Sequence, residues 1–315
     1  MHARRGWAPG VALLLAVSTL AADPPDFALK KVADGVYAAV ATPGGKAGSN
    51  SGFIVGGNGV VVVDTFLSPA PAAALLAEIH KLTQLPVRYV VNTHYHLDHT
   101  GGNSVYADRG AILAAQRNVR AWEHSENLKF FGANPTPEQK ARVAAMVLPD
   151  LLYPDGIDIY LGERLLQVRS MPGHTGGDSV VFVPDANVVF AGDLVWTHHL
   201  PNLIDASTDK WIASLDQLLA EHPTATFLAG HGEVATANDV RDFREYLVSL
   251  RQEIAKAQAE GKSEQALVDA VTAALQPKYG SWGFFNNFVK RNIEQTAAEL
   301  TGKKHIPRPV SGARP

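Results

Sequence analysis

The chain has 315 residues, of which 46% are hydrophobic and 19% charged, so it has the composition of an ordinary globular protein. Its length fits one large domain or two small ones. The formal net charge at pH 7 is −3 and no basic block occurs, so the charge does not support a nucleic-acid partner. Cysteine is absent, which excludes thiolate metal sites and cysteine nucleophiles.

The first 22 residues have the pattern of a secretory signal peptide. Arg4 and Arg5 precede the apolar stretch 11–17, and small residues lead to a predicted cleavage site after Ala21 or Ala22. The apolar stretch is shorter than a membrane span requires, which makes an uncleaved anchor the weaker interpretation. We therefore expect a periplasmic or secreted protein whose mature chain does not insert into a membrane, and both Sec and twin-arginine export stay open.

The first half of the mature chain is predicted to be rich in strands. The glycine-rich segment 56–59 lies between two valine-rich runs and predicts a hairpin. A helix with proline at its start is expected over 71–82. The strands expected in this half cover 36–40, 52–55, 60–63 and 87–91.

A helical insertion at about 118–150 separates these strands from a second set. The second set covers 157–160, 165–168, 179–183, 188–191 and 226–229, and helices are expected over 211–220, 238–276 and 286–300. Two sets of strands with helices between and after them predict an α+β fold, in which two sheets pack face to face and helices lie outside. A doubly wound parallel sheet fits less well, because too many hairpin turns occur.

Four potential metal ligands lie within six residues, directly after the strand predicted at 87–91. They are His94, His96, Asp98 and His99. A single tetrahedral zinc would be crowded by four ligands from so short a segment. Two adjacent metals that share the segment fit better.

Three further potential ligands occupy glycine-flanked turns, each just beyond a predicted strand. They are His174, Asp193 and His231. Glycine lets the backbone turn sharply, and loops at strand ends are where a rigid scaffold presents functional groups. Residues of metal-binding types thus recur just beyond predicted strands. We therefore interpret the seven residues as one metal centre.

Together with Asp64, which follows the strand 60–63, this ordered set of motifs resembles the metallo-β-lactamase superfamily of metallo-hydrolases. The resemblance extends from about Val32 to Gly232. It implies a four-layer αββα sandwich with C-terminal helices and with the metals at one edge of the two sheets. We expect this domain to cover 23–236 and a helical extension, 237–315, to pack on it.

The resemblance also implies a role for each ligand. His94, His96 and His174 would hold a first metal, Asp98, His99 and His231 a second, and Asp193 would bridge the two. Two Zn²⁺ ions are the implied cofactors, and the implied reaction is attack by a bridging hydroxide on an ester, lactone, thioester or amide of a small-molecule substrate. Asp98 could also orient that hydroxide and pass on its proton, which makes it the candidate catalytic residue.

Other residues have two open interpretations. Asp64 either accepts hydrogen bonds from the ligand loop and fixes the histidine geometry, or simply caps its strand. His198 and His199 either contact substrate or are surface and supporting residues. The insertion aromatics Phe130 and Phe131 form either a lid or a packing contact. The C-terminal aromatics belong to the core or to the pocket: Tyr279, Trp282, Phe284, Phe285 and Phe288.

The substrate class is the least determined feature. The best-known zinc β-lactamases carry cysteine or serine at one position of the second site, whereas this chain has Asp193 in that region. The segments 48–55 and 92–103 look most like periplasmic hydrolases associated with sulfur oxidation and quinoproteins, so we expect β-lactam cleavage only as a weak side activity. Alternatives are a glyoxalase-II-like thioesterase, although Lys290 and Arg291 match no glutathione motif, a persulfide-dioxygenase-like enzyme with one iron, and a non-catalytic metal-binding protein.

Overall fold

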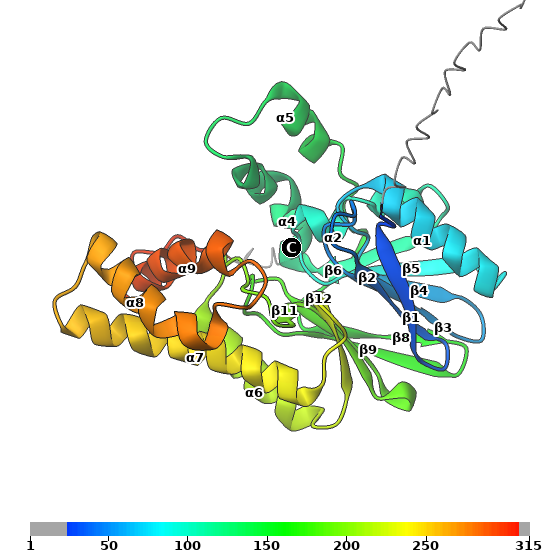
Figure 1. Cartoon of the computed structure of the whole chain (residues 1–315). Coiled ribbons are helices and arrows are strands. Elements are labelled where there is room, and N and C mark those ends of the chain that lie inside the picture. The colour runs from blue at the N-terminus through cyan, green and yellow to red at the C-terminus, as the bar shows by residue number, and fades with distance from the viewer. Residues whose placement is uncertain (1–23, 309–315) are drawn as a thin grey trace, which may run out of the picture.

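Two β-sheets pack face to face and helices cover both outer sides in the computed structural model, which describes residues 24–308 (Figure 1). The predicted signal peptide lies outside the described residues. Side chains from both sheets form one buried cluster, which includes Val61 and Val63 from the first sheet and Val181 and Phe190 from the second. The layer order is helix, sheet, sheet, helix, as the sequence predicted.

In the described part of the chain, the first sheet holds seven strands in chain order. The pairs from β1 to β4 are antiparallel, and those from β4 to β7 are parallel. The predicted hairpin at 56–59 is confirmed, because Val55 pairs with Val60. The strands are β1 (Phe27–Ala33), β2 (Val36–Ala41), β3 (Ser51–Val55), β4 (Val60–Val63), β5 (Val87–Asn92), β6 (Ile112–Gln116) and β7 (Leu151–Tyr153).

The second sheet has the order β12-β11-β10-β9-β8. Only β11 and β12 run parallel to each other within it. The strands are β8 (Gly156–Leu161), β9 (Arg164–Ser170), β10 (Ser179–Val183), β11 (Val188–Trp196) and β12 (Thr226–His231). β11 is longer than predicted and buried along its whole length.

Asn50, in the loop between β2 and β3, joins the two sheets. Its side-chain amide donates to the carbonyls of Ala229 (2.9 Å) and Gly232 (2.8 Å), and its oxygen accepts from the Ala41 amide (2.8 Å). Its own backbone N–H donates to Gly230 at 2.7 Å. These hydrogen bonds hold the end of β12 against the first sheet at the edge that carries the candidate ligands.

Helices cover each sheet with an apolar face. On the first sheet α1 (Pro69–Leu82) buries Leu75 and Ile79 in one cluster with Val62. On the second sheet α6 (Thr208–Glu221), α7 (Ala237–Ala259), α8 (Glu264–Tyr279) and α9 (Phe285–Leu300) share a core cluster with β11. The C-terminal helices therefore belong to the same hydrophobic core as the second sheet.

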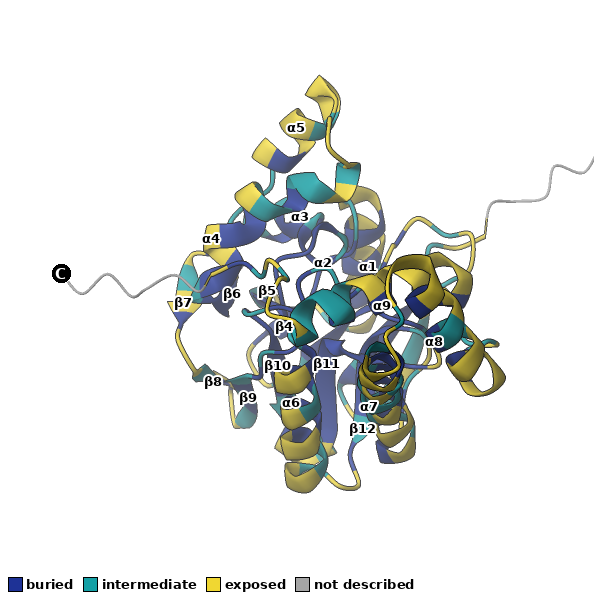
Figure 2. Cartoon of the chain, turned by 90° about the vertical axis from the view of Figure 1, so that its left-hand side faces the viewer, coloured by how far each residue is buried: buried dark blue, intermediate teal, exposed yellow. Residues whose placement is uncertain are grey.

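The elements differ from the expectations in three respects. The predicted helical insertion is formed by α4 (Arg117–Glu126), a 3-10 turn η1 (Asn127–Phe131) and α5 (Pro137–Ala144), and it ends before 150. The strands β6 and β7 were not predicted, because β6 is rich in alanine and β7 has only three residues. The helical pattern over 238–276 forms two helices, α7 and α8, because Gly261 turns the chain with a φ of +76°. Figure 2 shows α5 projecting from the sandwich with a largely exposed surface.

Within residues 24–308, no helix combines the length and apolar character that crossing a bilayer requires.

Candidate metal centre

All seven predicted ligands meet at one edge of the sandwich. His94 and His96 lie between β5 and the short helix α2 (Leu97–Thr100), and His174 lies between β9 and β10. Contrary to the prediction of turns, Asp193 lies inside β11 and His231 is the last residue of β12. The structure sorts the seven into two neighbouring groups: His94, His96, His174 and Asp193, and then Asp98, His99 and His231.

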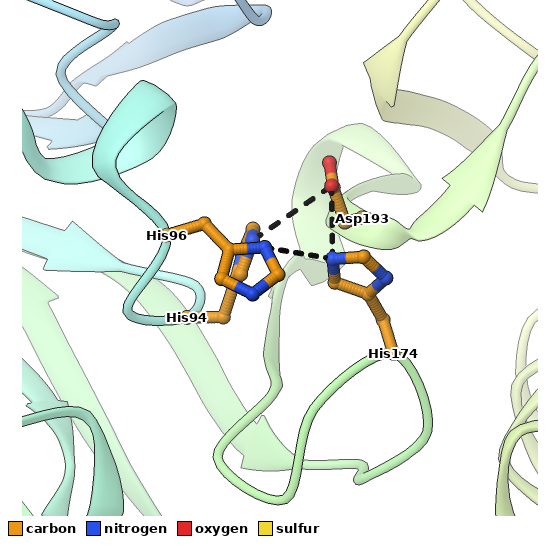
Figure 3. Close-up of side chains that lie close together, drawn as sticks. All are labelled: His94, His96, His174 and Asp193. Atoms are coloured by element: carbon orange, nitrogen blue, oxygen red, sulfur yellow. Dashed lines mark hydrogen bonds and ion pairs between the residues drawn. The ribbon is translucent and has the colours of Figure 1, made fainter. Parts of the chain in front are cut away.

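In the first group, four buried side chains face one another (Figure 3). Nδ1 of His96 lies 3.0 Å from Nε2 of His174. Oδ2 of Asp193 lies 3.2 Å from Nε2 of His174 and 3.7 Å from Nε2 of His94. Burial, together with the neighbouring His99, holds the pKa of His94 well below its usual range. The ring is therefore neutral at physiological pH, which is the form that binds metals.

The other oxygen of Asp193 faces the second group, which consists of Asp98, His99 and His231. Oδ1 of Asp193 lies 3.0 Å from Nε2 of His99 and 3.4 Å from Nε2 of His231. Oδ2 of Asp98 lies 3.3 Å from Nε2 of His231 and 3.8 Å from Nε2 of His99. Asp193 thus faces each group with a separate oxygen.

The donor atoms of these groups fit bound metal ions. Four buried ligand atoms form no well-oriented hydrogen bond among the described residues, although the last of them lies within ion-pair distance of the second and third: Nε2 of His94, His99 and His231, and Oδ1 of Asp193. Such atoms cost stability when they stay unsatisfied, and a coordinated cation would satisfy them. Imidazole nitrogens and carboxylate oxygens suit zinc and related divalent metals.

Glycines beside the ligands allow the close approach. A Cβ added to Gly230 would lie 2.0 Å from Oδ1 of Asp193, so no side chain fits there. Gly192 has a φ of +51°, and a Cβ on it would lie 2.4 Å from Oγ1 of Thr93. The glycines that flank the ligands in the sequence therefore allow close packing inside the metal centre, Gly230 against Asp193 and Gly192 against Thr93.

Asp64 lies behind the second group. Its Oδ1 accepts from the Thr93 backbone N–H and its Oδ2 from the Thr93 hydroxyl, both at 2.7 Å. Oδ2 also lies 2.8 Å from Nδ1 of His99. Asp64 therefore contacts the ligand loop in the way the first of its two interpretations describes, and it lies outside both ligand groups.

Asp205, in the loop between β11 and α6, is a further residue of the site that was not predicted from the sequence. Its Oδ2 accepts from the Tyr95 hydroxyl (2.5 Å) and lies 3.1 Å from Nε2 of His96, whose other nitrogen faces the first group. Its Oδ1 accepts from Nζ of Lys129 in η1. A carboxylate behind a ligand histidine fixes the ring's tautomer and orientation. No pattern in the sequence links Asp205 to His96, because 109 residues separate them.

A cavity of about 440 Å³ opens over both groups. Its floor includes metal ligands of both groups, and its walls carry five aromatic side chains: Phe130, Phe131, Trp196, Phe284 and Phe288. Of the C-terminal aromatics, Tyr279 and Phe285 are buried in the core instead. A larger surface hollow of about 580 Å³ around Arg164 and Asp185 contains none of the seven ligands.

His198 and His199 do not line the cavity. The His198 side chain is 56% exposed and lies 3.8 Å from Asp239. Nδ1 of His199 donates to the Thr197 carbonyl at 2.7 Å, and its ring packs on Phe284. Their direct contact with substrate stays a prediction.

Comparison with known proteins agrees with this arrangement. The model of the metallo-beta-lactamase superfamily matches residues 44–231, which is more than half of the chain. The chain belongs to this superfamily. A solved metallo-beta-lactamase from Pontibacter korlensis shares the fold, with a TM-score of 0.57 and 21% identity over 70% of this chain and 99% of that one. The expected sandwich with C-terminal helices is thereby confirmed.

Several curated relatives are hydrolases. A linear primary-alkylsulfatase from a Pseudomonas species is 21% identical over 51% of this chain and 37% of its own length. The human acyl-coenzyme A thioesterase MBLAC2 is 34% identical over 34% of this chain and 40% of its own. A Brucella anthropi hydroxyacylglutathione hydrolase is 26% identical over 51% and 54%. The chain thus spans about half or less of these relatives' lengths.

Proposed function

We propose that the protein is an exported dinuclear zinc hydrolase that cleaves a carbonyl-type bond of a small molecule, which is an ester, lactone, thioester or amide. The observation that carries this proposal is Asp193, whose two oxygens face two separate groups of ligands. A site for one iron would need only some of the seven candidate ligands. The complete second group, with Asp98, His99 and His231, therefore favours two metals over the dioxygenase-like alternative. The proposal of export rests on the signal pattern of residues 1–22.

Two zinc ions bound there would supply Lewis acidity and a water that loses its proton near neutral pH. Asp98 is the most exposed carboxylate among the ligands, at 30%, and lines the cavity. Burial opposes its ionisation, but in the metal-free protein protonated His99 and His231 outweigh this and lower its pKa, and a bound cation would act in the same direction. Asp98 is therefore ionised at neutral pH and can accept a hydrogen bond that orients the attacking water.

An aromatic ring beside the site restrains one of its ligands. Trp196 stacks on His231 with ring centroids 3.9 Å apart and an interplanar angle of 22°. This contact leaves the His231 ring little freedom to rotate.

A glyoxalase-II-like thioesterase is the second candidate function, and it is a narrower one within this class of hydrolases. Two of the relatives are named for thioester substrates, acyl-coenzyme A and hydroxyacylglutathione. The glyoxalase-II-like alternative nevertheless expects a basic glutathione site in the C-terminal helices. Lys290 is exposed there and pairs with Glu294, and it does not line the cavity.

Metal analysis of the purified protein combined with a substrate panel tests the proposal. We expect two zincs per chain, and hydrolysis of an ester, lactone or thioester that stops with a chelator and returns with added zinc. The panel includes a β-lactam, for which we expect weak turnover, and a phosphoester as the negative control. One iron per chain with oxygen uptake, or two zincs without cleavage of any carbonyl substrate, would contradict it.

A further inference from the structure

We infer that the substrate carries an extended apolar acyl chain, which lies between Phe130 of the insertion and Phe284 of the C-terminal extension. The inference rests on the proposed carbonyl hydrolysis and names its substrate class. It starts from the cavity walls, whose five aromatic side chains come from three separate segments of the chain: η1, β11 and the region around the start of α9. Leu67 and Leu97 add further apolar surface.

Phe130 and Phe284 are more exposed than their size and apolar character favour. They are 36% and 43% exposed, and they are two of six large hydrophobic side chains with such exposure in the described part of the chain. Single exposed apolar residues are common on protein surfaces and need no explanation. Here, however, both rings line one concave site above metal-ligating groups, and gathered apolar surface of this kind marks ligand binding.

The two rings stand over different halves of the metal centre. The Phe130 ring lies edge-on to His96 of the first group, with centroids 4.8 Å apart. The Phe284 ring lies 6.5 Å from His231 of the second group and 6.3 Å from Trp196. A carbonyl held at the metal ligands therefore has aromatic surface on both sides, along which an apolar chain can extend.

The position of Phe284 is built into the fold. Its φ is 61°, a left-handed conformation that is rare for a bulky residue and persists only where surrounding structure imposes it. Two backbone hydrogen bonds of 2.8 Å fix the neighbouring Gly283, one to His198 and one from Leu200. A Cβ on Gly283 would lie 2.2 Å from the His199 ring, so the loop after β11 packs directly under Phe284.

The charge of the cavity agrees with this substrate class. Besides the metal ligands, Arg142 is the one charged side chain among residues 24–308 that lines it, and its guanidinium already donates to the Leu67 carbonyl at 2.7 Å. The site therefore combines a polar floor with apolar walls. A molecule with one polar reacting group and an apolar chain matches both, and a volume of about 440 Å³ is within the usual range of small-molecule sites.

A chain-length series on the zinc-loaded protein tests the inference. The substrates are p-nitrophenyl acetate, butyrate, octanoate and decanoate. Burial of each methylene should raise kcat/KM about fourfold until the cavity is filled. The variants Phe130→Ala and Phe284→Asn should lower the octanoate-to-acetate ratio about tenfold or more. Asparagine is chosen at 284 because it tolerates the left-handed backbone.

Tyr160→Ala is the matched control, because this aromatic side chain on β8 is 60% exposed and does not line the cavity. Its octanoate-to-acetate ratio of kcat/KM should equal that of the wild type. A flat series in the wild type would overturn the inference and leave carbonyl hydrolysis intact. A ratio lowered equally by Tyr160→Ala would overturn it as well.

Calorimetry separates this inference from the proposed function. Decanoate should bind the zinc-loaded protein more tightly than acetate, and Phe130→Ala should weaken this preference about tenfold. If no ester is cleaved but this pattern holds, carbonyl hydrolysis is wrong and the apolar site stands. Equal affinity for the two carboxylates would refute the apolar site.

Discussion

The seven metal ligands and the aromatic walls above them differ in what holds them in place. The ligands lie at the ends of buried strands or within them, and hydrogen bonds to Asp64 and Asp205 fix two of the histidines. Apart from Trp196 of β11, the aromatic walls come from η1 and the start of α9, which lie around the sandwich, and their phenylalanines are partly exposed. The comparison indicates that the sheets determine the reaction and that the added helices select the substrate.

Asp193→Ala should give the largest effect, since this residue faces both groups of ligands. We expect metal content to fall from two ions per chain to one or fewer, and kcat/KM to fall at least about a hundredfold. Metal analysis and kinetics on the same preparation measure both. Asp185→Ala, an exposed carboxylate outside the centre, is the control. A variant that keeps two metals and full activity would show that the bridging assignment is wrong.

Asp205→Asn should have an intermediate effect, because Asp205 acts on the metal through His96 and is a positioning residue. Loss of the carboxylate behind a ligand histidine weakens metal affinity by about 10- to 100-fold. Competition with a chelator measures the affinity, and kinetics at saturating zinc separate binding from turnover.

Lys129→Met is the matched comparison for Asp205→Asn. It removes the contact from the insertion to Asp205 and leaves the carboxylate behind His96 in place. We expect a smaller loss of metal affinity than in Asp205→Asn. If Asp205→Asn lowers only the melting temperature, and metal affinity stays the same, the positioning role is refuted.

Glu123→Gln should give the smallest effect, and it concerns the stability of the insertion. Glu123 on α4 is fully buried and neither of its oxygens has a well-formed hydrogen bond among the described residues. Burial raises its pKa well above the usual 4.5 and Arg120 only partly opposes this. Above pH 4.5 the unfolded chain releases the proton that the folded chain keeps, so stability falls as the pH rises.

The glutamine variant removes this dependence. We expect it to be more stable than the wild type at pH 7, with the difference shrinking towards zero near pH 4. Urea unfolding at both pH values measures the difference in the free energy of unfolding. A difference that does not change with pH would mean that the ionisation of Glu123 is not its cause.

Much of the metal centre could be predicted, because its ligands carry local signals. His94 to His99 stand directly after a valine-rich strand, and glycines flank Asp193 and His231. Asp205 carries no such signal, because only the folded chain brings it to His96. The strand β6 was not predicted, because it is rich in alanine, a residue that does not favour strands over helices. Its conformation depends on its tertiary pairing with β5. The left-handed backbone of Phe284 likewise follows from tertiary contacts rather than from local preference.

The candidate ligands come from both sheets. His94, His96, Asp98 and His99 follow β5 of the first sheet, and His174, Asp193 and His231 belong to the second. A cation held by both sets cross-links the sandwich in the folded state only, so metal binding and folding are thermodynamically linked. By mass action, each tenfold rise in free metal above the dissociation constant adds about 1.4 kcal/mol per bound ion to the free energy of unfolding. The resistance of this protein to unfolding and proteolysis would then follow the metal supply of the compartment in which it works.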